Sequence, residues 1–192
     1  LIASDAIAIA KELGHDSFHL VGHEWGSAAA WLLAATSPES VRTLTAISIP
    51  HPTAFGLALA TDADQQQRSG YMQWFRTETE AAAALLAKDG ALLRAVYGAD
   101  VDDASVERYV TRFSEPGALD AALNWYRAEA GFLIDTPAVT MPTTYLWGNA
   151  DVAVSRFAAE ECAKSVDSDY RFVEVDGGHW LPDTHADLVA HE

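Results

Sequence analysis

The sequence is poor in cysteine and in basic residues. Cys162 is the single cysteine among 192 residues, so no disulfide can form within the chain. Cysteine scarcity is typical of proteins kept in a reducing compartment, and we expect a cytoplasmic location. Basic residues number 12 against 28 acidic ones, and they are scattered singly. Because no basic stripe is present to neutralise phosphates, we expect neither nucleic acid nor an anionic membrane as a partner.

Long apolar runs are also missing. None reaches the length that spans a bilayer, and the first residues, "LIASDAIAIAKELG", contain an acid and lack a basic segment. The sequence therefore predicts neither a transmembrane helix nor a signal peptide. What is present is a 49% hydrophobic composition, enough to bury the core of one domain with an insertion.

The first quarter of the chain has the pattern of a parallel α/β unit. Apolar residues recur at helical spacing over 3–13, and Gly14 marks the end of that helix. A strand is expected over 17–23, a helix over 27–38 and a second strand over 41–50. The second strand lacks clean alternation, which indicates that both of its faces are covered. Strand, helix and strand in this order predict parallel pairing through a right-handed crossover.

The middle of the chain changes character. From about Gly56 to Asp135 the pattern contains no buried strand and predicts helices over 65–88, 90–98, 103–114 and 117–132. The α/β pattern then resumes with strands at 143–154 and 169–178, a helix between them, and a last helix from about Asp183. We expect an α/β core at 1–55 and 137–192, interrupted by a helical lid at 56–136.

The stretch "GHEWG" at 22–26 has the spacing of a nucleophile elbow. In a G-x-nucleophile-x-G turn the central residue occupies a sharp corner between a strand and a helix, and small flanking residues prevent a clash. Glu24 is the residue that such a turn would display. The positive end of the helix dipole favours an anion at this position, which suits a carboxylate. The alternative is a tight turn that uses its glycines for geometry alone.

Two later residues supply the partners that a nucleophile needs. Asp151 follows the strand in "YLWGNADVAV", and His179 follows the next strand in "FVEVDGGHW". The chain order nucleophile, acid, histidine is that of a triad on a parallel sheet, in which the acid orients an imidazole that deprotonates water. Asp176 competes as the acid, but we interpret it as part of the turn. The other histidines are expected to be structural or solvated: His15, His19, His23, His51, His185 and His191.

On these residues the sequence resembles α/β-hydrolases of the epoxide hydrolase and haloalkane dehalogenase branch. That branch carries "GHDWG" at the elbow, and "SIPHP", "YLWGxxDxA" and "GHW" match it as well. The resemblance covers essentially the whole chain. It implies the α/β-hydrolase fold, a mostly parallel sheet with a helical lid inserted midway.

The resemblance also implies roles for two aromatic residues of the lid. Epoxide hydrolases of this kind carry two lid tyrosines that hydrogen-bond the oxirane oxygen; "SGYMQWFR" matches the first at Tyr71 and "ALNWYRA" the second at Tyr126. A phenol donates a hydrogen bond at neutral pH and can stabilise the developing alkoxide. Dehalogenases instead bind a halide, commonly through the tryptophan after the nucleophile. Trp25 occupies that position, and its backbone N–H is also the expected oxyanion donor.

The sequence departs from the family pattern in two places. Glutamate replaces the usual aspartate at position 24, and the extra methylene moves the carboxylate by roughly one ångström, which can cost about 10²-fold in rate. The family's early strands, with the HG-x-P loop that gives a second oxyanion donor, have no counterpart. The strand at 18–22 should therefore be an exposed edge. We expect these residues to be part of a longer polypeptide.

Three hypotheses follow from the sequence. The first is an enzyme that opens epoxides with water, using Glu24, Asp151, His179, Tyr71 and Tyr126. The second is a dehalogenase with the same ester intermediate. The third is a catalytically silent hydrolase-fold protein that binds an apolar ligand. In each case the expected partner is a small apolar molecule, no metal or organic cofactor is implied, and formation of a homodimer is left open.

Overall fold

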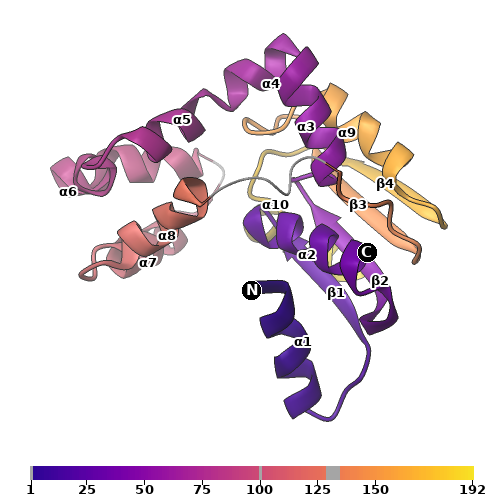
Figure 1. The fold of residues 1–192 in the computed structure, drawn as a ribbon. Coiled ribbons are helices and arrows are strands. Elements are labelled where there is room, and N and C mark those ends of the chain that lie inside the picture. Colours follow the sequence, from indigo (N-terminus) through magenta and orange to yellow (C-terminus); the bar gives the residue numbers. More distant parts are fainter. Residues whose placement is uncertain (1, 100, 129–134) are drawn as a thin grey trace. The chain divides into compact units, whose positions relative to one another are not determined.

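The computed structural model describes residues 2–99, 101–128 and 135–192, and these divide into two compact units. The first unit comprises Leu1–Arg68 and Gly131–Glu192, and the second comprises Ser69–Ala130. In the first unit, helices alternate with strands along the chain, whereas the described residues of the second unit form helices (Figure 1). The expected lid boundaries near 56 and 136 stay a prediction.

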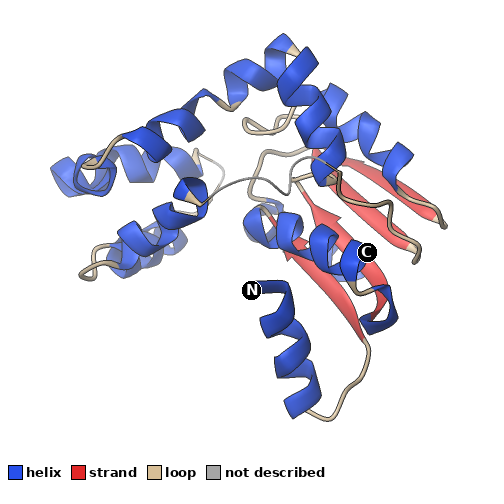
Figure 2. Ribbon diagram, viewed as in Figure 1, coloured by secondary structure: helices blue, strands red, loops and turns tan. Residues whose placement is uncertain are grey.

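The described strands of the first unit form one parallel sheet. Its order is β1-β2-β3-β4, and neighbouring strands are hydrogen-bonded in parallel throughout (Figure 2). The strands are β1 (Phe18–His23), β2 (Val41–Ile47), β3 (Thr143–Gly148) and β4 (Tyr170–Val175). Because all four run in the same direction, their carboxyl ends meet at one edge of the sheet. The parallel α/β sheet predicted from the sequence is confirmed.

The helices of the first unit follow the expected order with shifted ends, except for one over 52–61 that the sequence did not predict. Those before the second unit are α1 (Ile2–Glu12), α2 (Trp25–Thr36), the 3₁₀ turn η1 (Pro38–Ser40), α3 (Pro52–Thr61) and α4 (Ala63–Arg68). Those after it are α9 (Arg156–Glu161), the 3₁₀ turn η3 (Cys162–Ser165), α10 (Leu181–Thr184) and α11 (Ala186–His191). Gly14 has φ 83°, which fits its predicted role of ending the first helix.

Both faces of the central strands are covered, as the lack of alternation predicted. On one face the indole of Trp31 from α2 lies 6.5 Å, centroid to centroid, from the ring of Tyr145 on β3. On the other face Ile47, Leu146 and Val175 pack with Leu181 of α10. Full burial of a large apolar side chain contributes about 1.5–3 kcal/mol, so these two layers fix β2 and β3 in the middle of the core.

Strand β1 lies at an edge of the sheet. Among the described residues it pairs with β2 alone, and the side chain of Val21 is 62% exposed. The exposed edge expected for this strand is therefore present in the structure. Of the helices in the described residues, none has the length and apolar character that crossing a bilayer requires.

The second unit contains α5 (Gly70–Thr77), α6 (Ala81–Tyr97), α7 (Asp103–Phe113) and α8 (Ala118–Arg127). Within it, α5 packs against α8, and α6 packs against α7. Three consecutive residues of α6, Lys88, Asp89 and Gly90, have positive φ and divide it into two helical halves. This break agrees with the boundary that the sequence predicted between Lys88 and Gly90.

Two expectations about the middle helices need correction. The single helix predicted over 65–88 is wrong, because the chain leaves the helical conformation near Ser69 and again at 78–80, which gives α4, α5 and the first half of α6. The first break had a signal in the sequence, because Ser69-Gly70 is a dipeptide typical of turns and Gly70 has low helix propensity. The helix predicted over 117–132 ends at Arg127, and its predicted residues 129–132 lie outside the described ones.

Candidate active site

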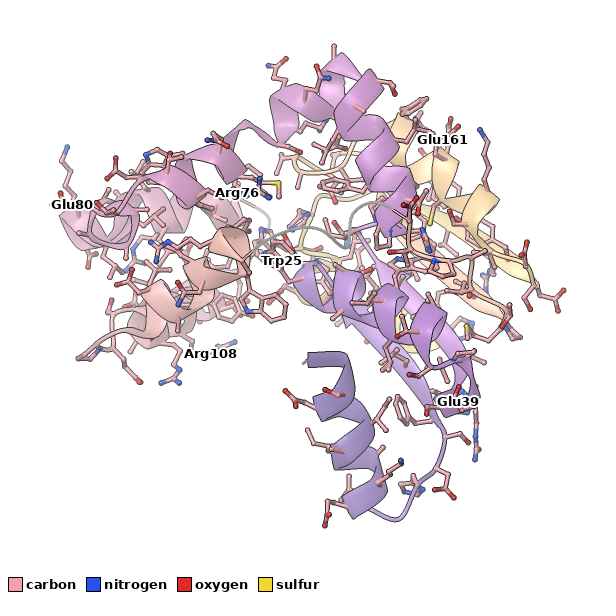
Figure 3. All side chains as sticks on the ribbon, in the orientation of Figure 1. Trp25, Glu39, Arg76, Glu80, Arg108 and Glu161 are labelled. Carbon is pink, nitrogen blue, oxygen red and sulfur yellow. The ribbon has the colours of Figure 1, made fainter. Side chains whose placement is uncertain are left out.

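Glu24 occupies a strained corner between β1 and α2. Its φ is 54° and its ψ is −123°, a backbone conformation that residues other than glycine rarely adopt. The backbone holds it from both sides: the Glu24 N–H donates to the carbonyl of Ile47 at 3.3 Å, and the Glu24 carbonyl accepts from Ala28 at 3.1 Å. Figure 3 labels the next residue, Trp25, where the chain enters α2. The corner thus has the local geometry that the "GHEWG" spacing predicted.

The two glycines of the motif have different roles. A Cβ on Gly22 would lie 2.3 Å from the carbonyl oxygen of Gly26, whereas a Cβ on Gly26 would meet no heavy atom within 4 Å. The close approach of β1 to the first turn of α2 therefore requires glycine at position 22. The expectation that both flanking residues must be small is wrong for Gly26 among the described residues, because its missing side chain would point away from them.

The environment of Glu24 favours the neutral acid. Burial raises the pKa of its carboxyl to about 7, against a smaller lowering by His179 and by a hydrogen bond from the Trp25 backbone N–H. The N–H expected to act as an oxyanion donor thus lies beside the carboxylate, at the amino end of α2. Both the peptide hydrogen bond and the helix dipole support negative charge there once the proton has left.

Asp151 lies in the turn after β3 and is 1% exposed. Its Oδ1 accepts from the backbone N–H groups of Ala153 at 2.7 Å and Val154 at 3.1 Å. Both carboxylate oxygens lie 3.1 Å from Nδ1 of His179. Burial raises the pKa of Asp151, but the hydrogen bonds from His179 and Ser48 and the charge of His179 outweigh it and leave the pKa below its ordinary value.

His179 reaches Asp151 because two loops approach closely at the carboxyl edge of the sheet. A Cβ on Gly148 would lie 2.4 Å from the carbonyl oxygen of Gly177 and 2.3 Å from that of Gly178. The imidazole is 7% exposed, and with Nδ1 donating to Asp151 its Nε2 is the nitrogen left to accept a proton. Burial lowers the pKa of His179, but the hydrogen bond and charge of Asp151, with a contribution from Glu24, raise it above the ordinary value.

The structure therefore brings Asp151 and His179 into direct contact and couples both electrostatically to Glu24. Asp176, the competing acid, is exposed on the surface. In this arrangement a carboxylate at a helix amino end lies near an imidazole that a buried acid orients. Such a set of groups can form an ester and then hydrolyse it with water.

Sequence reasoning missed two residues that hold this arrangement. Ser48, the residue after β2, is fully buried, and its Oγ donates to Oδ2 of Asp151 at 2.7 Å. His23, which was expected to be structural, has its Nε2 2.9 Å from the backbone carbonyl oxygen of His179, and their ring centroids are 5.3 Å apart. Burial, followed by the charge of His179, lowers the pKa of His23, so its neutral imidazole can donate this hydrogen bond. Ser48 is the first residue of the motif "SIPHP", which was noted for the family resemblance but gave Ser48 no role.

Helix α4 fixes the loop that carries the acid. Gln65 is fully buried; its Nε2 donates to the carbonyl of Ala153 at 2.7 Å, and its Oε1 accepts from the N–H of Ser155 at 2.8 Å. Arg68, at the end of the same helix, donates from its guanidinium to the carbonyl of Asp151. The sequence placed Gln65 and Arg68 in a helix but gave no sign of these contacts.

His51 has the structural role that the sequence predicted. It is fully buried and caps α3, with its Nδ1 accepting from the N–H of Thr53 at 3.2 Å and its Nε2 3.1 Å from the carbonyl oxygen of Pro137. Burial lowers the pKa of His51 to about 4, so the ring is neutral when it makes these contacts. Neither nitrogen is left for chemistry.

In the second unit, the structure brings Tyr71 of α5 and Tyr126 of α8 together. Their ring centroids are 5.9 Å apart, and Phe75 lies edge-on to both, at 5.4 Å from Tyr71 and 4.9 Å from Tyr126. Nε of Arg76 donates to the backbone carbonyl of Tyr126 at 3.0 Å and ties α5 to α8. The catalytic roles of both tyrosines stay a prediction.

Within the described residues, no group of three or more His, Cys, Asp or Glu side chains is arranged to hold a metal ion.

Comparison with known proteins identifies the family to which this chain belongs. A model described as the alpha/beta hydrolase fold matches residues 2–186. The chain belongs to the α/β hydrolase fold family. Within that family its relatives include epoxide hydrolases.

Among curated proteins, the AB hydrolase superfamily protein YfhM of Bacillus subtilis is 32% identical over 187 residues, 94% of this chain and 65% of that protein. Epoxide hydrolase 4 of Mus musculus is 30% identical over 200 residues, 98% of this chain and 56% of that protein. A fluoroacetate dehalogenase from Burkholderia is 27% identical, covering 98% of this chain and 66% of its own length. The chain thus spans between about half and two thirds of these relatives.

Among solved structures, a Bacillus megaterium epoxide hydrolase in complex with an inhibitor superposes with a TM-score of 0.85. The match covers 98% of this chain and 72% of that one at 24% identity. At this identity the likeness supports the fold.

The different surroundings of the two elbow glycines predict opposite effects of alanine. Gly22→Ala should lower the free energy of unfolding by roughly 3 kcal/mol or more, because its Cβ would collide with backbone atoms that cannot move without separating β1 from α2. Gly26→Ala should be neutral or stabilising by up to about 1 kcal/mol, because alanine favours helix and the space is open. Urea unfolding followed by circular dichroism measures both. Equal losses would contradict this assignment of the close contact.

The bridging role of Gln65 predicts a large effect on the acid loop. Gln65→Ala should lower the free energy of unfolding by roughly 2–4 kcal/mol, because a buried carbonyl and a buried N–H both lose their partner. The neighbouring Gln66 is exposed, and Gln66→Ala should change stability by less than about 0.5 kcal/mol. Thermal unfolding of the two variants is the measurement. A Gln65→Ala protein as stable as Gln66→Ala would show that the bridge contributes little.

Proposed function

We propose that the protein hydrolyses epoxides to diols through an ester on Glu24. The main support is Glu24 itself: its backbone is strained at the strand-to-helix corner, and its carboxylate is coupled electrostatically to the buried Asp151–His179 pair. The choice of epoxides is supported by the adjacent phenols of Tyr71 and Tyr126 and by the similarity to proteins named epoxide hydrolases. The substrate class that suits these residues is a small apolar epoxide.

In the first step, a carboxylate oxygen of Glu24 attacks one oxirane carbon. A carbon–oxygen bond forms to Glu24 as the ring carbon–oxygen bond breaks, and the ring oxygen takes a proton from the phenol of Tyr71 or Tyr126. The phenols act as electrophilic donors, because they stabilise charge that develops on the oxygen only as the ring opens.

In the second step, Nε2 of His179 accepts a proton from water, and the resulting hydroxide attacks the carbonyl carbon of the ester. The negative charge on the carbonyl oxygen is stabilised by the N–H of Trp25. Collapse of this intermediate breaks the bond to the Glu24 carbonyl carbon and releases the diol. The diol oxygen takes the proton from His179, the Glu24 carboxyl group releases its proton to solvent, and the phenolate recovers a proton from solvent, which restores the enzyme.

The raised pKa of Glu24 predicts the pH dependence of the first step. Only the ionised carboxylate attacks, and the pKa is about 7, so the rate of ester formation should rise with pH through about 7 and then level off. Glu24→Asp removes one methylene and should increase that rate by about 10²-fold. Glu24→Gln is the control and should form no ester. Rapid-quench measurements on the full-length protein test this, and a rate that is flat between pH 5 and 9 would contradict it.

Isotope labelling tests the ester itself. In a single turnover of an aryl or alkyl epoxide in ¹⁸O-water, the label should enter the carboxyl group of residue 24 and be absent from the diol, because water attacks the ester carbonyl. Mass spectrometry of the peptide carrying Glu24 and of the diol gives both readings. A labelled diol with an unlabelled Glu24 would exclude the ester. Unchanged turnover after both Tyr71→Phe and Tyr126→Phe would exclude the phenol roles.

A second candidate is dehalogenation through the same ester. It is supported by the similarity to a protein named fluoroacetate dehalogenase and by Trp25 after the nucleophile. Halide release from haloalkanes or haloacids, with no diol formed from any epoxide in the panel, would favour it over epoxide opening.

A further inference from the structure

Ser48 is buried at the end of β2, where hydrogen bonds from the neighbouring strand hold its backbone in a strained conformation. It is fully buried and follows the last residue of β2 with φ 67°, in the left-handed region that costs a residue other than glycine about 1 kcal/mol or more. Its N–H donates to the carbonyl of Leu146 at 2.9 Å, and its carbonyl accepts from the phenol of Tyr145 at 2.5 Å. The neighbouring strand β3 thus fixes the Ser48 backbone through two hydrogen bonds.

This strained backbone directs the hydroxyl at the Asp151–His179 pair. Oγ of Ser48 donates to Oδ2 of Asp151 at 2.7 Å and lies 3.0 Å from Nδ1 of His179. The three side chains come from the carboxyl ends of three different strands and are all buried. Since Oδ1 is already bonded to the Ala153 and Val154 N–H groups, Ser48 supplies the matching hydroxyl contact for Oδ2.

We propose that Ser48 is a positioning residue for the hydrolytic half of the reaction, fixing the Asp151 carboxylate in the orientation that holds His179. This inference rests on the proposed function. Ser48 acts through Asp151 and has no contact with Glu24 among its hydrogen bonds. It therefore acts directly on the step in which His179 activates water, and it reaches the attack by Glu24 only indirectly, through the charges of Asp151 and His179.

The hydroxyl also adjusts the basicity of His179. A hydrogen bond from Ser48 stabilises the ionised form of Asp151 and lowers the pKa of Asp151. Because part of the carboxylate charge is then satisfied by the hydroxyl, Asp151 stabilises the protonated form of His179 less strongly. Without the hydroxyl, Asp151 attracts the imidazolium more strongly, and the pKa of His179 rises. The charged groups facing this imidazole are Asp151 and Glu24, and His23 approaches from β1 in its neutral form.

The test separates the two half-reactions in Ser48→Ala. Rapid-quench measurement on the full-length protein, at a pH above 8 where Glu24 is ionised, should show ester hydrolysis slowed by roughly ten- to a hundredfold, with ester formation changed by less than about twofold. The pH midpoint of hydrolysis should move upward, and an NMR titration of the His179 ring should shift in the same direction. A residue that only supported the fold would not move either midpoint.

The matched control is Ser27→Ala. Ser27 is equally buried, and its hydroxyl donates at 2.6 Å to the carbonyl of Ile49, which also accepts from the Trp31 indole. It does not contact Asp151 or His179 among its hydrogen bonds, so both half-reactions and the His179 titration should match those of the parent protein. Ser48→Gly is the second variant, because it removes the hydroxyl and also relieves the strain of the positive φ.

The outcomes distinguish this proposal from the proposed function. If the parent protein forms no ester with any epoxide, the function fails, and the His179 titration in Ser48→Ala and Ser48→Gly still decides whether Ser48 tunes the pair. If the ester forms but a folded Ser48→Ala or Ser48→Gly hydrolyses it at the parent rate with an unshifted midpoint, the role of Ser48 is overturned and the function stands.

Discussion

The missing side chain at Gly148 is the constraint on which the rest of the site depends. With no Cβ at this position, the carbonyl groups of Gly177 and Gly178 can approach the end of β3 to a distance that any other residue would forbid. The turn after β3 presents Asp151, and the loop after β4 presents His179. Their close approach brings the carboxylate and the imidazole within 3.1 Å of each other while both remain buried.

A buried carboxylate beside a buried imidazole is costly unless every lone pair is satisfied. The structure meets this condition with groups from several elements: two backbone N–H groups of the acid turn, the hydroxyl after β2, and the imidazole itself. Helix α4 holds the same turn from outside through Gln65 and Arg68. The pair is thus pre-organised by contacts that are already complete before a substrate arrives, which is what efficient proton transfer requires.

The sequence predicted those parts of the site that follow from local pattern. A G-x-x-x-G spacing between an apolar strand and a helix was enough to locate Glu24, and residues directly after parallel strands were enough to bring Asp151 and His179 to one edge. Ser48, His23 and Gln65 could not be found in this way. Each contacts a residue 88 to 156 positions away, and neither serine, histidine nor glutamine has a local signature for such a role. The helix break near Ser69 was missed although Ser69-Gly70 is a dipeptide typical of turns, since the longer helix-favouring pattern around it was given more weight.

The contact between Arg68 and the carbonyl of Asp151 limits where the second unit can be replaced by that of another protein with this fold. Arg68 is the last residue of the first unit before the chain enters the second unit, so the point where the chain departs for the second unit is bonded to the acid turn itself. A chimera that replaces the second unit with that of a relative would preserve the acid only if its junction lay after Arg68. Grafts that begin earlier, inside α4, would exchange Gln65 and Arg68 along with the helices and would uncouple the acid turn from its support.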